Sequence, residues 1–179
     1  YRIGDFDRMP VIHWMCWEDT YIRWKKEGMP KHIDRLKGEH QFLGAHYQWS
    51  TVACHLGPYP LFETKVVEDT DEYTLSWDGN GVLMKDFKNA ESVPHDMDWA
   101  FKTADEWPRF KDRLQVNKDR IPKRLDEHIA RAENSGLPIV LFAGSLMGWV
   151  RDWMGVENMI YLMFDSPDCY ADIVDTISD

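Results

Sequence analysis

Two kinds of hydrophobic pattern run along the chain, and each predicts a type of element. Short apolar runs that end in glycine, cysteine or charged residues are typical of strands, whereas apolar positions gathered on one helical face predict helices. The predicted strands cover residues 9–17, 47–60 and 139–143. The predicted helices cover residues 18–28, 103–114, 119–136, 156–164 and 166–177, and a weaker helix-and-loop segment covers residues 31–44.

The ends of two predicted helices carry the residues that helix termini favour. The helix over residues 18–28 begins with acidic residues, ends with lysines and closes on Gly28, as the helix dipole favours. The helix over residues 166–177 has Ser166 as its N-cap and Pro167 in its first turn. Both boundaries therefore follow from local chemistry.

Residues 65–87 show a different pattern, in which apolar and polar residues alternate on both sides of the sequence "DGNG". Alternation around such a turn predicts a two-stranded β-hairpin. We expect this hairpin to be an insertion, followed by a loop in which His95 can fold over the mouth of a pocket.

Strands that alternate with helices predict an α/β protein with a parallel sheet. A (β/α)8 TIM barrel usually takes about 250 residues, so these 179 residues are expected to be its first half. We accordingly expect one domain over residues 1–179, with an inserted hairpin, taken from a longer protein.

Composition and charge narrow the functional classes. A hydrophobic content of 44% supports a real core, and a net charge of −10 argues against a nucleic-acid surface. No apolar run approaches the roughly 20 residues that span a bilayer, and no signal-peptide core is present. Three widely spaced cysteines do not resemble a disulfide framework. We expect a cytoplasmic protein with reduced thiols and no membrane partner.

The stretch "PIVLFAGSLMGWVRDWMG", residues 138–155, begins with an apolar run that we expect to be a strand covered on both faces, as in a parallel sheet. It then runs into glycines and charges. In α/β folds, ligands bind where parallel strands end, and glycines allow a close approach. The residues predicted to line such a site are Phe142, Gly144, Ser145, Met147, Arg151 and Asp152. The alternative is an ordinary glycine turn followed by a helix whose Arg and Asp are solvated.

Histidine and cysteine residues mark the ends of the first two predicted strands. His13 and Cys16 lie in the first, and Cys54 and His55 in the second. Histidine suits proton transfer or metal binding near neutral pH, and a thiolate binds soft metals. Their spacing matches no zinc motif, so we assign no metal here and keep buried cysteines with a hydrogen-bonded histidine as the alternative.

Four tryptophans form a further group, namely Trp14, Trp17, Trp149 and Trp153. Indoles near strand ends can make a flat apolar wall for a planar substrate. We expect half of the four to belong to the core, and we assign Trp14 and Trp17 to substrate binding.

The segment 138–155, followed by "YLMFDSPDCYADIVDTI", resembles the uroporphyrinogen decarboxylase superfamily. Upstream, "MPVIHWMCW" and the stretch from Tyr59 to Leu114 look like the amino-terminal half of its divergent, methyltransferase-like members. The resemblance implies a barrel with a pocket at the strand ends, where Phe142 and Gly144 match a pocket-lining Phe-Ala-Gly. Asp152 or Trp153 falls near the place of a pocket tyrosine in decarboxylases.

Two departures from the decarboxylases direct the functional prediction. Their arginine-rich segment after the first strand is replaced by "HWMCWEDTYIRW", and "VACHLG" stands where their catalytic aspartate would be. Without an arginine clamp the reason to expect a polycarboxylate substrate is lost. We therefore predict corrinoid-linked methyl transfer, with His55 or His13 moving a proton and Asp152 fixing Arg151.

The resemblance also implies the cofactors and partners. A corrinoid would be carried by a partner protein, and zinc would be bound by the carboxyl half, which this sequence does not contain. We expect a small-molecule substrate and consider a homo-oligomer. The alternatives are a decarboxylase of a tetrapyrrole or another organic acid, and a non-catalytic interaction protein if the chain is complete.

Overall fold

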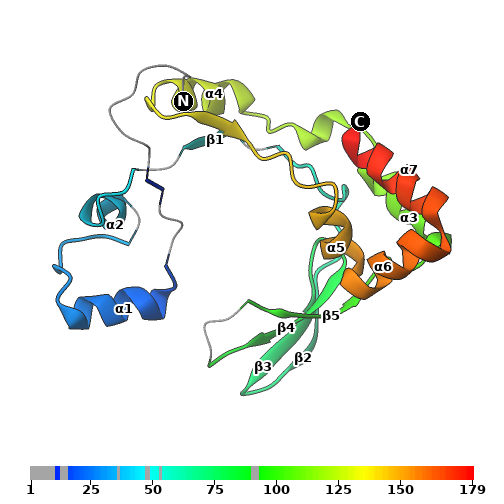
Figure 1. Ribbon diagram of the computed structural model, residues 1–179, viewed down its shortest axis with the longest axis horizontal. Coiled ribbons are helices and arrows are strands. Elements are labelled where there is room, and N and C mark those ends of the chain that lie inside the picture. The colour runs from blue at the N-terminus through cyan, green and yellow to red at the C-terminus, as the bar shows by residue number, and fades with distance from the viewer. Residues whose placement is uncertain (1–10, 13–15, 36, 47–48, 53, 90–92) are drawn as a thin grey trace. The chain divides into compact units, whose positions relative to one another are not determined.

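Figure 1 shows the computed structural model, which describes residues 11–12, 16–35, 37–46, 49–52, 54–89 and 93–179. These residues form a mixed α/β structure and no closed barrel. The contacts divide the chain into a first unit, residues 1–53 and 123–142, and a second unit, residues 54–122 and 143–179. A single domain over residues 1–179 stays a prediction, since each unit joins two separate stretches of chain.

The elements of each unit are as follows. The first unit holds α1 (Glu18–Glu27), α2 (Lys37–Phe42), β1 (Ser50–Val52), α4 (Leu125–Glu133) and β6 (Ile139–Leu141). The second unit holds the strands β2 (Lys65–Asp69), β3 (Tyr73–Trp77), β4 (Val82–Phe87) and β5 (His95–Trp99). It also holds α3 (Trp107–Lys111), α5 (Gly148–Met154), α6 (Val156–Asp165), α7 (Pro167–Ser178) and the 3₁₀ turns η1 (Ala104–Glu106), η2 (Asp112–Leu114) and η3 (Lys118–Arg120).

Helix α1 follows the predicted chemistry of its ends. Acidic residues occupy its first turn and lysines its last, and Gly28 ends it with φ of 118°. That left-handed conformation is one that glycine adopts without strain. The helices predicted over residues 18–28, 156–164 and 166–177 are confirmed as α1, α6 and α7, and α7 has Pro167 at its start. The helix predicted over residues 119–136 is confirmed only over α4, and the one predicted over residues 103–114 is divided into η1, α3 and η2.

The first unit contains a parallel pair of strands, β1 and β6, in register from Ser50 opposite Ile139 to Val52 opposite Leu141. This confirms that the second and third predicted strands run parallel. The expectation of a strand covered on both faces is wrong, because Ile139 is 50% and Leu141 58% exposed. In the described residues only two short strands make this sheet, so its faces stay partly open.

The predicted strands over residues 9–17 and 47–60 are shorter than expected or lie elsewhere. Of the first, only Val11, Ile12, Cys16 and Trp17 are described, and Ile12 makes a single parallel bridge to His46. The second is correct only over Ser50–Val52. Beyond Val52, the Gly57-Pro58 sequence interrupts regular pairing, and the backbone of His55 bonds to the carbonyl of Arg120 instead.

The inserted hairpin is confirmed, but it belongs to a four-stranded antiparallel sheet in the order β2-β3-β4-β5. The two-strand prediction missed a turn before β3, where the Thr70 hydroxyl accepts bonds from the amides of Glu72 and Tyr73. It also missed β5, so His95 pairs opposite Lys85 instead of lying in a loop. The turn from β3 to β4 is closed by Asp78, whose carboxylate accepts bonds from two amides.

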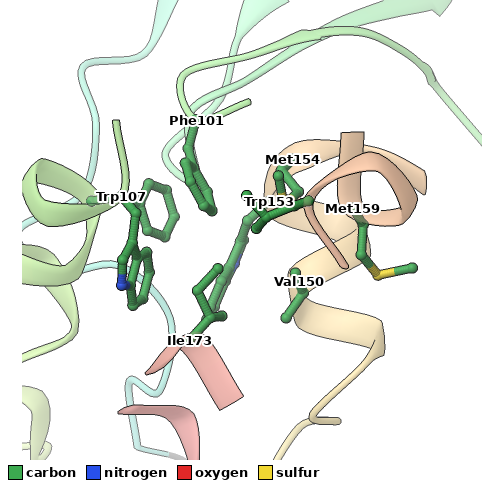
Figure 2. Close-up of a cluster of buried hydrophobic side chains, with 9 residues drawn as sticks. Phe101, Trp107, Val150, Trp153, Met154, Met159 and Ile173 are labelled. Carbon is green, nitrogen blue, oxygen red and sulfur yellow. The ribbon is translucent and has the colours of Figure 1, made fainter. Parts of the chain in front are cut away.

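The core of the second unit lies where α3, α5, α6 and α7 meet the segment after β5 (Figure 2). Its centre is aromatic: the ring centroids of Phe101 and Phe110 lie 5.1 Å apart, and those of Phe110 and Trp153 lie 5.4 Å apart. The remaining buried members are Trp107, Val150, Met154, Met159, Leu162 and Ile173. Among the helices of the described residues, none is long and apolar enough to cross a membrane.

Candidate functional site

The predicted site residues fall in separate parts of the structure. His13 and Trp14 lie outside the described residues. Trp17 and Phe142 belong to the first unit, at the start of α1 and just after β6, and they are 52% and 69% exposed. The other predicted residues, which belong to the second unit, are His55, Gly144, Ser145, Met147, Arg151 and Asp152.

The loop from Gly144 to Gly148 leads into α5 and is closed by its own side chains. The Ser145 hydroxyl accepts a bond of 2.9 Å from the amide of Gly148, and the Ser145 carbonyl accepts one of 3.0 Å from the amide of Trp149. Ser145 thus satisfies amides at the helix start that would otherwise lack partners. Met147, in the same loop, is 60% exposed and available for contact.

Gly144 serves a purpose different from the expected one. Its φ is 74°, and a Cβ placed on it would lie 2.1 Å from the Trp149 indole. The indole therefore packs directly over the glycine backbone. The space that we expected beside Gly144 is filled, so this glycine seats a tryptophan and does not open a pocket at that point.

Arg151 and Asp152 form a pair on the surface of α5. The Nε and Nη2 atoms of Arg151 both donate to Asp152 Oδ1, at 2.9 and 2.7 Å. Both side chains are more than half exposed, so one edge of the guanidinium is engaged and the rest faces solvent. Such a steadied guanidinium can accept a carboxylate or phosphate as a second partner.

A carboxylate from β5 adds to the electrostatics around this pair. Burial and the nearby charges of Asp152 and Asp78 raise the pKa of Asp96, while the charge of Arg151 lowers it. Asp96 and Arg151 therefore interact across α5 and β5. The arginine thus interacts with two carboxylates, Asp152 and Asp96, and an anionic ligand must compete with them for it.

His55 is held by its own loop and by a neighbouring ring. Its Nε2 lies 2.9 Å from the carbonyl of Pro58, and its ring makes an edge contact with Tyr59 at 5.6 Å between centroids. Because a carbonyl only accepts hydrogen bonds, Nε2 carries the proton in this contact. Nδ1 is then the ring nitrogen that can exchange a proton with a substrate.

The tryptophans divide between core and surface. Trp153 is buried in the core of the second unit, and Trp149 stacks on it at 5.3 Å. These two indoles therefore support packing, as we expected for half of the four. Trp17 remains exposed, and Trp14 lies outside the described residues.

The Cys16 thiol donates a hydrogen bond to Glu39 Oε2, at 3.3 Å. Burial, the bond to Glu39 and the charge of Glu39 raise the pKa of the Cys16 thiol, which disfavours a metal-binding thiolate. Within the described ranges, no group of three or more His, Cys, Asp or Glu residues could hold a metal ion. The residues present there do not fit a zinc site.

Sequence reasoning missed a cavity of about 450 Å³ in the second unit. Its lining residues are Phe62, Glu63, Trp77, Gly81, Ala100, Asp105, Glu106, Arg109, Phe110 and Arg113. They come from several segments that are separated in the chain, so no local motif points to them. The only signal was the i, i+4 spacing of Arg109 and Arg113, which places both on one helical face.

Comparison of the chain with protein-family models, with curated proteins and with solved structures gave no match.

Proposed function

We propose that this chain forms part of a uroporphyrinogen decarboxylase-like (β/α)8 enzyme whose reaction is corrinoid-linked methyl transfer. The parallel pairing of β1 and β6 carries the proposal. Both strands end in register, at Val52 and Leu141, and in the sequence these ends are followed by "ACHLG" and "FAGS". Segments that follow parallel strand ends are where α/β enzymes place their ligands.

Within that reaction, the chain's own groups have distinct roles. Arg151, steadied by Asp152, orients an anionic group of the substrate, and His55 supplies the proton that the leaving oxygen takes up as its bond to the methyl group breaks. Met147, in the same unit as His55 and Arg151, supplies exposed apolar surface for substrate binding. The substrate-binding roles of Trp17 and Phe142, in the first unit, stay predictions from the sequence. All three cysteines are free thiols, which supports a reducing, cytoplasmic compartment.

The corrinoid on a partner protein would donate or accept the methyl group. Since the described residues do not fit zinc, no step of the proposal relies on it. Proton transfer is assigned to His55, and orientation of the substrate to the guanidinium of Arg151.

The proposal is tested by incubating the chain with cob(I)alamin and methyl donors, with methylcobalamin formation followed by absorbance. The donors are methanol, a methyl thioether and a methoxybenzoate, of which only the last is anionic. We expect protein-dependent turnover with the methoxybenzoate. Absence of methylcobalamin with every donor, or release of carbon dioxide from the acid instead, would overturn methyl transfer.

Two variants separate catalytic roles from structural ones. His55→Ala should abolish turnover while the midpoint of thermal unfolding changes little, whereas a core histidine would show the reverse. Arg151→Lys should weaken methoxybenzoate binding by about tenfold, because lysine cannot reproduce the two-pronged contact. Arg131→Lys, at an exposed position of α4, is the matched control.

A further inference from the structure

We propose that the cavity between α3 and the turn from β3 to β4 binds a small zwitterion with a planar apolar body, of the class of the aromatic α-amino acids. Its volume, about 450 Å³, lies within the range of small-molecule sites, which is roughly 300–1,000 Å³. None of its lining residues belongs to the strand-end group described above. The site is therefore independent of the proposed methyl transfer.

One wall of the cavity is already built in the free protein. The Phe62 ring stacks on the buried Phe110 ring at 5.8 Å and 29°, and the Arg113 guanidinium covers Phe62 at 4.0 Å. The amide of Phe62 donates to the carbonyl of Gly79 at 2.9 Å. Aromatic rings held in place in this way present apolar surface at little entropic cost.

Gly81 brings a second wall close to the first. Its φ is 84°, and a Cβ placed on it would lie 3.0 Å from both Ala100 and the Phe62 ring. The amide of Ala100 donates to the Gly81 carbonyl at 2.8 Å. The cavity's width here is thus set by a glycine and an alanine.

The charged lining residues divide into engaged and free groups. Glu106 accepts bonds from the amides of Lys102 and Thr103, at 2.8 and 3.1 Å. Arg113 donates to the carbonyls of Pro60 and Leu61. These two charges already serve to hold the walls.

Three charges remain, namely Glu63, Asp105 and Arg109. All three are exposed, and in the part of the chain that the structure describes their side chains make no hydrogen bond and no ion pair. A cationic ligand would meet repulsion from Arg109, and an anionic one from Glu63 and Asp105. In a ligand that carries both charges, the ammonium can pair with the two carboxylates and the carboxylate with Arg109. The aromatic wall favours a ligand whose body is planar and apolar.

The ligand class is tested by calorimetric titration of the full chain with four probes. L-Phenylalanine carries both charges, its amide only the ammonium, and its N-acetyl derivative only the carboxylate, while L-leucine keeps both charges but lacks the ring. We expect L-phenylalanine to bind at least about tenfold more tightly than its amide and its N-acetyl derivative, which corresponds to the lower end of a charge-assisted contact. It should also bind more tightly than L-leucine, which lacks the ring. Absence of binding by L-phenylalanine in the millimolar range, or equal binding of all four, would overturn the proposal.

Two variants assign the charges. Arg109→Gln should remove the preference of L-phenylalanine over its amide, and the double variant Glu63→Gln, Asp105→Asn should remove its preference over the N-acetyl derivative. The replaced side chains are exposed and unpaired, so the thermal midpoint should stay that of the parent. Arg131→Gln, another exposed arginine, is the control that should change neither preference. Unchanged preferences in both cavity variants would place the ligand elsewhere and overturn the assignment.

Discussion

The two units of this chain differ in how much apolar surface they bury. Of the twelve buried hydrophobic side chains in the described residues, only Met29 and Ala132 belong to the first unit. The second unit contains the whole aromatic cluster around Phe101 and Trp153. The parallel strand pair thus lies in the sparsely packed unit, and the antiparallel sheet in the unit with a core. Since burial of apolar surface is the main stabilising contribution, the second unit should dominate the measured stability.

The same substitution in each unit gives the largest contrast. Phe101 is fully buried, whereas Phe142 is 69% exposed. Phe101→Ala should lower the free energy of unfolding by about 3–5 kcal/mol, because it leaves a cavity in a packed core. Phe142→Ala should lower it by less than about 1 kcal/mol. Both are measured by urea unfolding.

Hydrogen exchange of the parent protein provides the matching control. Amides of α3, α6 and α7 should be protected more strongly than those of β1 and β6, since local stability follows buried contacts. Equal protection in the two units, or equal losses for the two phenylalanine variants, would contradict the comparison.

Two glycines separate the effect of packing from that of backbone conformation. Gly144 and Gly136 have similar φ angles, 74° and 69°, but only at Gly144 would a Cβ meet another atom within 4 Å. Gly136→Ala should lower the free energy of unfolding by about 1–2 kcal/mol, the usual effect of a left-handed alanine. Gly144→Ala should lower it by about 1–3 kcal/mol more, because the Trp149 indole must move. Equal losses in thermal unfolding would show that the indole is free to shift.

The lowered pKa values of two carboxylates, one in each unit, test whether electrostatic stabilisation is also larger in the second unit. In the second unit, hydrogen bonds from Lys111 and Trp107 lower the pKa of Asp172 below its ordinary 3.8. In the first, a hydrogen bond from Arg124 lowers the pKa of Glu127. A lowered folded pKa means that the unfolded chain binds more protons in acid, so the stabilisation is present above the ordinary pKa and is lost as the pH falls through the folded value.

Asp172 connects α7 to α3, whereas the ion pair of Glu127 is local, with Arg124 three positions earlier in the chain. Asp172→Asn should therefore reduce stability at pH 7 and flatten its decline in acid. Glu127→Gln should leave the curve nearly unchanged, because exposed local pairs contribute little. The measurement is the free energy of unfolding as a function of pH, and superimposable curves for Asp172→Asn and the parent would contradict this prediction.

Local patterns predicted α1, α6, α7 and the turn from β3 to β4 well, because their signals lie within a few residues. The lysines and Gly28 define α1, and Pro167 marks the start of α7. Strand β5 was missed because its pairing depends on β4 and not on its own sequence. The covered strand over residues 139–143 was wrong because burial depends on what packs against a strand, which periodicity does not reveal.

The site was harder to predict for the same reason. The pairing of Arg151 with Asp152 follows from adjacency, and the structure contains it. The filling of the space at Gly144 by Trp149, and the cavity lined by Arg109 and Phe62, join residues through tertiary packing. No spacing rule in the sequence carries that information.

The smallest expected effect concerns Arg151 and Asp152, which lie on the surface of the well-packed second unit. Both side chains are more than half exposed, so their attraction is screened by solvent. Arg151→Ala, Asp152→Ala and the double variant should each change the free energy of unfolding by no more than about 0.5 kcal/mol, with a coupling of similar size. A coupling well above about 1 kcal/mol would show that the pair stabilises α5. The contribution of an ion pair to stability would then depend more on its place in the packed unit than on its exposure to solvent. If the coupling is small, any effect of Arg151→Lys on anion binding cannot come from altered stability, and it reports the guanidinium's contact with the ligand.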